Sequence, residues 1–313
     1  MKIFGVGYFA LGICTLATTL QACEAALPVG ARGAVAPRIL DRMPLAHSDS
    51  LLYVAEGSGR SVLIYNARAK DPAPESMITE GLNFPQAVCI DGAGTVYVTN
   101  QPASGPGWVS EYPAGKTKPS KMITKGINSP AFCAIDSKGN LWIANLSGPS
   151  VTAYKPGSAK PFATITKGMI EPVGIAIDHS DNMYVSNGLL GSAQNVVVFS
   201  AGSKSPSRTI TDGVMSPVGI TVDAKGTLYV TNISQNNVQE YLVGQSDPYQ
   251  TITRGMDKPA AVTVNRAGRL YVSNVGDNSI VEFPPRSIQP SSKRIGKDLY
   301  FPLGSAYSPP LLP

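Results

Sequence analysis

Apolar and polar residues alternate in short stretches along most of the chain, and the stretches recur as a module. Alternation with a period of two and many β-branched residues predict β-strands rather than helices. The prolines that open successive modules are 45, 42, 45 and 42 residues apart. The superimposable segments are PQAVCIDGAGTVYVTN (85–100), PAFCAIDSKGNLWIAN (130–145), PVGIAIDHSDNMYVSN (172–187), PVGITVDAKGTLYVTN (217–232) and PAAVTVNRAGRLYVSN (259–274).

Each module predicts four strands, which we label a to d in chain order. Strand b carries one aromatic column and strand c another. The strand b column is Tyr53, Tyr97, Trp142, Tyr184, Tyr229 and Tyr271, and the strand c column is Tyr65, Tyr112, Tyr154, Phe199, Tyr241 and Phe283. A module of this length with four strands is one propeller blade. We therefore predict an all-β protein, a six-bladed β-propeller of four-stranded antiparallel blades.

The first blade has strands b, c and d but no strand a. The segment 302–308 begins Pro-Leu-Gly-Ser-Ala, which echoes Pro-Val-Gly-Ile-Ala at 172. We expect this C-terminal segment to supply the missing inner strand and to leave no open sheet edge. The segment 30–46 is the rival donor, but its Pro44 lies nine residues before Tyr53, whereas Pro172 lies twelve before Tyr184.

The turns between strands a and b begin with a short acidic or amide residue that can accept backbone N–H groups. The residues are Asp91, Asp136, Asp178, Asp223 and Asn265. A glycine follows three residues later in four of these turns, where a left-handed backbone is needed. Asp181 replaces the glycine in the fifth.

The pattern P-x-G-[IV]-A-[IV]-D…G-x-[LM]-Y-V-[ST]-N resembles the NHL-repeat type of propeller over about 47–308. The resemblance is closest to secreted bacterial members. NHL repeats often carry Asp after Y-V-x, where this chain has Asn. Propellers host many functions, so the resemblance implies the fold and no single activity.

A more distant resemblance is to gluconolactonase/regucalcin-type six-bladed hydrolases. It implies a divalent metal held by Asn or Asp directly after the opening proline, since hard cations need several oxygen ligands. The matching residues here are Gln86, Ala131, Val173, Val218, Ala260 and Leu303. Only Gln86 offers an oxygen, so we expect no metal, no cofactor and no catalytic residues. His47 and His179 fall at a strand edge and in a turn, where a general base is not expected.

The N-terminus differs from the repeats. Lys2 precedes an uncharged stretch over residues 3–20, which is typical of a secretory signal. Leu20-Gln21-Ala22-Cys23 resembles the bacterial lipobox, which implies lipid attachment at Cys23. We predict a signal peptide (1–22), a stalk (23–46), the propeller (47–308) and a tail (309–313). The alternatives are ordinary secretion, to the periplasm or beyond, and a retained membrane anchor.

Composition narrows the function classes. Gly (31) and Pro (26) are abundant in 313 residues and charged residues are only 15%, which excludes a coiled coil and disfavours disorder. The net charge is +5, but the basic residues form no run, so a nucleic-acid surface is not expected.

Two cysteines stay in the folded part, Cys89 and Cys133. They lie on strand a of adjacent blades with opposite parity, so they point toward each other or directly apart. An exported setting permits a disulfide. Two buried thiols are the favoured alternative.

A polar residue ends each strand b: Glu56, Asn100, Asn145, Asn187, Asn232 and Asn274. The favoured hypothesis is that each amide bonds the backbone of its own b–c loop. The other is a candidate ligand rim, with Glu56 as the odd member. The longest b–c loops, 101–107 and 188–194, are further candidates for recognition.

Together these patterns predict an extracytoplasmic, membrane-tethered lipoprotein of the bacterial cell envelope. We expect a monomeric, non-catalytic scaffold that binds a protein or glycan on the b–c loop face and contacts the membrane only through its lipid. The alternatives are a lactonase- or lyase-like hydrolase with an atypical site and a structural envelope protein.

Overall fold

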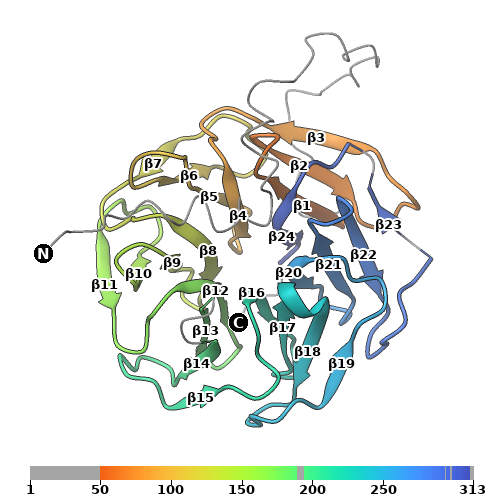
Figure 1. Ribbon diagram of the computed structural model, residues 1–313. Coiled ribbons are helices and arrows are strands. Elements are labelled where there is room, and N and C mark those ends of the chain that lie inside the picture. The colour runs from red at the N-terminus through yellow and green to blue at the C-terminus, as the bar shows by residue number, and fades with distance from the viewer. Residues whose placement is uncertain (1–49, 189–193, 293, 297, 311–313) are drawn as a thin grey trace, which may run out of the picture. The chain divides into compact units, whose positions relative to one another are not determined.

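The computed structural model describes residues 50–188, 194–292, 294–296 and 298–310, which form six four-stranded antiparallel sheets (Figure 1). From the inside outward, blade 1 is β24 (Pro302–Ser308), β1 (Leu51–Glu56), β2 (Ser61–Asn66) and β3 (Pro74–Ile78); blade 2 is β4 (Pro85–Ile90), β5 (Val96–Asn100), β6 (Trp108–Tyr112) and β7 (Lys121–Ile123); blade 3 is β8 (Pro130–Ile135), β9 (Leu141–Asn145), β10 (Ser150–Tyr154) and β11 (Pro161–Ile165). Blade 4 is β12 (Pro172–Ile177), β13 (Met183–Asn187), β14 (Asn195–Phe199) and β15 (Arg208–Ile210); blade 5 is β16 (Pro217–Val222), β17 (Leu228–Asn232), β18 (Asn237–Tyr241) and β19 (Gln250–Ile252); blade 6 is β20 (Pro259–Val264), β21 (Leu270–Asn274), β22 (Ser279–Phe283) and β23 (Arg294–Ile295). A short 3-10 helix, Ile233–Gln235, lies between β17 and β18.

The C-terminal strand closes the ring. β24 pairs antiparallel with β1, with Leu51 opposite Ser308 and Val54 opposite Ser305. Each inner strand also contacts the inner strands of the two adjacent blades, including β24 with β4 and β20 (Figure 1). The prediction of a six-bladed ring closed by the tail is confirmed. The rival donor 30–46 lies outside the described residues.

The core lies between the blades, where each sheet packs against its neighbour. The strand c aromatic column is buried throughout, with Tyr65, Tyr112 and Phe283 fully covered. Buried tyrosine hydroxyls need a partner, and Tyr112 donates a 2.6 Å hydrogen bond to the Glu80 carbonyl in the loop that enters its blade. Tyr154 and Tyr241 make the equivalent bonds to Lys125 and Asp212. The column therefore holds both the core and the loops between blades.

The a–b turns follow the predicted chemistry. The Oδ1 atom of Asp178 accepts the backbone N–H groups of Ser180 and Asn182, and the equivalent residues of the other turns do the same. Asp181 adopts a left-handed φ of 60° in the place of the usual glycine. No helix among the described residues is long and apolar enough to span a membrane.

Candidate functional site

One edge of the ring carries both the b–c loops and the loops that connect one blade to the next. Each opening proline pairs with the polar residue that ends strand b, as Pro217 does with Asn232. The connecting loop and the b–c loop of a blade therefore leave the sheet at the same edge. We call this edge the crossing-loop face, formed by the b–c loops and by the loops before Pro85, Pro130, Pro172, Pro217, Pro259 and Pro302.

Five buried asparagines hold the connecting loops. Each Oδ1 accepts the N–H of the residue two positions before the proline, at 2.9–3.2 Å. In blades 3 to 6 the Nδ2 donates to the carbonyl of the glycine four positions before the proline. In blade 2 the Asn100 Nδ2 donates to Ser110 Oγ, which itself donates to the Gly81 carbonyl. The asparagines are Asn100, Asn145, Asn187, Asn232 and Asn274, each with 0% of its surface exposed.

This geometry corrects the favoured hypothesis about the ring of polar residues. The bonded backbone belongs to the loop that enters the blade, 17 residues upstream, and not to the amide's own b–c loop. The amides also lie inside the blades, with donors and acceptors directed at the chain itself. They hold the connecting loops of the crossing-loop face from inside the blades.

Glu56 takes the same place in blade 1. Its Oε1 accepts the N–H of Tyr300, two residues before Pro302, at 2.6 Å, and its Oε2 accepts the Ser61 hydroxyl at 2.6 Å. The side chain is 3% exposed. Burial raises the pKa of the Glu56 carboxyl, opposed by these two hydrogen bonds, and the nearby Asp298 raises it further. Glu56 thus holds the last connecting loop from within and does not mark an exposed functional edge.

The asparagine and glutamate bonds fix where the loop side chains project. Three residues whose N–H is held are apolar and exposed: Ile170 (43%), Met215 (46%) and Tyr300 (67%). Beside Tyr300, the rings of Phe84 and Phe301 lie 6.4 Å apart. Both phenylalanines precede the proline and adopt a positive φ (52° and 54°), which is costly for a bulky side chain. These residues were not predicted from the sequence; the signal that could have indicated them is an apolar side chain in a connecting loop, where the strand pattern does not require one.

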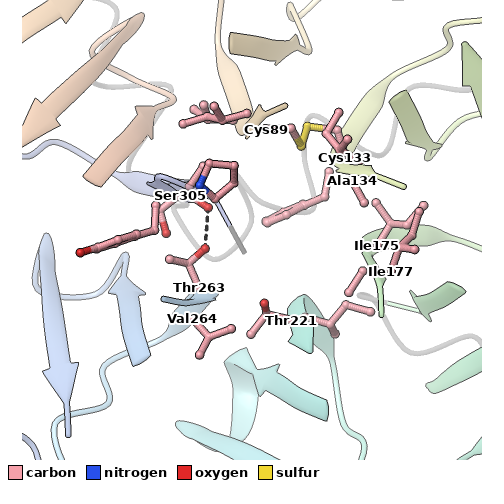
Figure 2. Close-up of a pocket in the computed structure, with 18 of the residues that line it drawn as sticks. Cys89, Cys133, Ala134, Ile175, Ile177, Thr221, Thr263, Val264 and Ser305 are labelled. Carbon is pink, nitrogen blue, oxygen red and sulfur yellow. Dashed lines mark hydrogen bonds between the residues drawn. A yellow bond between two sulfur atoms is a disulfide. The ribbon is translucent and has the colours of Figure 1, made fainter. Parts of the chain in front are cut away.

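The axial cavity lies among the inner strands near the opposite edge and has a volume of about 140 Å³. Its walls are mainly aliphatic, with Ile175, Ile177 and Val264 among them (Figure 2). Thr263 donates a 2.9 Å hydrogen bond to the Ser305 carbonyl across adjacent blades. The cavity is thus a narrow space where aliphatic side chains alternate with polar groups, among them Thr221, Thr263 and Ser305.

Toward the crossing-loop face the inner strands approach closely. A Cβ on Gly304 would lie 2.6 Å from the Cα of Ala87, so glycine is required there. The residues directly after the prolines, where the distant relatives place metal ligands, are buried: Gln86, Ala131, Val173, Val218, Ala260 and Leu303. Among the described residues no group of three or more His, Cys, Asp or Glu side chains is placed to hold a metal ion.

The other sequence-predicted residues are scattered. His179 is exposed in the a–b turn of blade 4, away from the crossing-loop face. Cys23, His47 and most of the loop 188–194 lie outside the described residues. The loop 101–107 is described, and most of its residues are exposed on the crossing-loop face.

A disulfide joins β4 to β8. Cys89 and Cys133 are bonded with their Cα atoms 6.0 Å apart, within the range for disulfides (Figure 2). The favoured prediction of two thiols is wrong: strands β4 and β8 converge near the axis, so the two side chains meet. Disulfides persist in oxidising compartments, which indicates an extracytoplasmic protein.

Known proteins resemble this chain in fold. No family model matches the sequence, and no curated protein sequence matches it. A chain in the crystal structure of a nidogen/laminin complex is similar, with a TM-score of 0.66 and 15% identity, over 83% of this chain and 98% of that one. A protein of unknown function from Bacteroides caccae is similar with a TM-score of 0.64 and 12% identity, over 83% and 99% of the two chains. At these identities the likeness shows the fold alone.

Proposed function

We propose that the chain is an exported, lipid-anchored, NHL-like propeller that acts as a non-catalytic scaffold and binds a partner protein through its crossing-loop face. The observation that carries this proposal is the exposure of apolar side chains at equivalent positions of several connecting loops. Ile170 and Met215 belong to adjacent blades, and Tyr300 stands beside the Phe84–Phe301 pair. Exposed apolar groups on a rigid frame are typical of protein interfaces.

Rigidity supports the same proposal. The N–H group of Met215 is held by Asn232, an amide with 0% exposure, so its loop is fixed before a partner arrives. A preorganised surface loses less conformational entropy on binding than a mobile one. The similar propeller-like chain crystallised in a nidogen/laminin complex is consistent with a scaffold of this kind.

Export and anchoring rest on two features. The disulfide Cys89–Cys133 favours an oxidising compartment. The charged start, the apolar stretch over 3–20 and the Leu20-Gln21-Ala22-Cys23 motif favour a lipid on Cys23. A stalk over 24–46 would let the propeller stand away from the membrane with its partner face free.

A pair of photo-crosslinking positions tests the proposal. A benzophenone amino acid replaces Met215 on the crossing-loop face, or Lys225 in an a–b turn at the opposite edge, in the full chain expressed in a bacterial host that carries it. Met215→Asp serves as the matched variant with the crosslinker at Ile170. We expect one discrete adduct from position 215 and from 170, loss of the 170 adduct in Met215→Asp, and no adduct from 225. Equal adducts from 215 and 225, or none from the crossing-loop positions, would refute it.

A further inference from the structure

A second hollow lies between blades 3 and 4, at the edge opposite the crossing-loop face. Its volume is about 540 Å³, within the range of small-molecule sites. β11 of blade 3 and the c–d turn 200–204 of blade 4 border it, with Met183 and Phe199 in its lining. Nothing in the proposed function uses this hollow.

At this hollow, blade 3 lacks the long side chains that blades 2 and 4 carry at the equivalent place. The strand register sets Trp142, Ala153 and Ala163 side by side across β9, β10 and β11. The residues level with Ala163 are Lys121 in blade 2, Arg208 in blade 4, Gln250 in blade 5 and Ser76 in blade 1. Blade 3 therefore has two alanines where blades 2 and 4 have longer side chains.

Those longer residues bridge to the next blade. Lys121 donates to the Gly157 carbonyl in the c–d turn of blade 3, at 2.7 Å. Arg208 donates to the Gln245 carbonyl in the c–d turn of blade 5, at 2.5 Å. The methyl group of Ala163 cannot reach the turn 200–204, so the groove between blades 3 and 4 stays open.

The open groove has an aromatic wall. Trp142 is the one tryptophan in the strand b column, and its indole N–H donates to Asp136 at 2.9 Å, which fixes the ring. Phe162 is 48% exposed and meets Trp142 edge to face, with the ring centroids 6.2 Å apart. Aromatic faces of this kind pack against the C–H face of a sugar ring.

Two lysine side chains at the rim are available to an anionic group. Lys138 and Lys204 are exposed there, and within the described part of the chain neither ammonium group has a carboxylate partner. The two carboxylates of the lining are already satisfied: Asp136 accepts from Asn140 and Trp142, and Asp181 accepts the N–H and hydroxyl of Ser137. The lysines are thus the groups left for a ligand.

From the missing bridge, the aromatic wall and the free lysines we infer that this hollow binds an acidic saccharide. A sugar ring packs on Trp142 and Phe162, and its carboxylate lies between Lys138 and Lys204. The probe is tri-galacturonic acid, with neutral maltotriose as its control, titrated calorimetrically into the mature chain. Trp142 fluorescence in a Trp108→Phe background gives a second, local signal.

Ala163→Arg is the decisive variant, because it restores the bridging cation of blade 4 and fills the hollow. Thr164→Arg adds the same charge at the neighbouring exposed position of β11 and is its matched control. We expect tri-galacturonic acid to bind, Ala163→Arg to lower the affinity about twentyfold or more without lowering the melting temperature, and Thr164→Arg to change it little. Loss of a charge-assisted contact in Lys138→Ala or Lys204→Ala should cost about tenfold.

Three results would overturn the inference: no binding of tri-galacturonic acid, equal binding of maltotriose, or undiminished binding by a folded Ala163→Arg protein. If Ala163→Arg does not fold, the double variant Lys138→Ala/Lys204→Ala decides, because both lysines are exposed and their removal leaves the core intact. Undiminished affinity in that variant would also refute it. The crosslinking test at position 215 addresses the opposite edge, so either proposal can fail alone.

Discussion

Among the described residues, no cation pairs with the buried carboxyl of Glu240, unlike its counterparts in blades 2 and 6. Glu240 lies on β18 opposite Tyr229 of β17 and is 5% exposed. In blade 2 the equivalent Glu111 pairs with Lys121 at 3.3 Å. In blade 6 the equivalent Glu282 pairs with Arg269 at 2.8 Å. Blade 5 has Gln250 at the position of Lys121 and Thr227 at the position of Arg269. Neither residue is a cation, so neither compensates the charge of Glu240.

Burial and then the nearby Asp223 raise the pKa of the Glu240 carboxyl from 4.5 to about 7. A rise of this size corresponds to roughly 3 kcal/mol. The folded protein binds the proton more tightly than the unfolded chain, so the free energy of unfolding falls as pH rises. The loss begins near pH 4.5 and is complete above pH 7.

Glu240→Gln removes this charge while keeping the shape of the side chain. We expect the variant to be more stable than the wild type by about 3 kcal/mol at pH 8, and equal to it near pH 4. Urea unfolding of the mature chain at the two pH values measures the difference. Glu111→Gln is the control, and it should give no gain at pH 8 because Lys121 already compensates that carboxylate. A Glu240→Gln effect that is the same at pH 4 and pH 8 would refute the reasoning.

Three further predictions follow from the ring of asparagines, the disulfide and the N-terminus. Asn232→Ala removes three hydrogen bonds, with the Met215 N–H, the Gly213 carbonyl and Asn237. We expect it to lower the free energy of unfolding, measured by urea unfolding, by about 3 kcal/mol. A change within about 0.5 kcal/mol would contradict this expectation. Reduction of Cys89–Cys133, separated by 44 residues, should lower it by about 4 kcal/mol, and intact mass after alkylation should show no adduct on these cysteines until a reductant is added. Cys23→Ala should move the chain from the membrane fraction to the soluble extracytoplasmic fraction, and an unchanged membrane fraction would exclude a lipid at this residue.

Local patterns predicted what depends on local chemistry. The alternation, the proline spacing and the incomplete first blade together predicted six blades and the closing strand β24. The a–b turns were predictable because an aspartate such as Asp178 bonds backbone groups two and four residues away. Each of these features is decided within one module or by the repeat of modules.

Contacts between modules were harder to predict. The partner of Asn232 lies 17 residues upstream and reaches it only because the chain enters the blade at that edge. The positions of Cys89 and Cys133 along their strands did not decide whether the two side chains point toward each other or apart. The disulfide forms because β4 and β8 converge. The hollow beside Trp142 depends on what Ala163 lacks relative to Lys121 and Arg208, and this appears only when the strands are aligned in register.

The crossing-loop face, the edge opposite it and the connecting loop before Pro302 all depend on the closure of the ring by β24. Amide hydrogen exchange of the mature chain, followed by mass spectrometry, tests this closure most directly. The account predicts slow exchange for those amides of Gly304–Tyr307 that pair with β1, since they are hydrogen-bonded within a sheet. Complete exchange of 302–308 within seconds, as in a free tail, would contradict it.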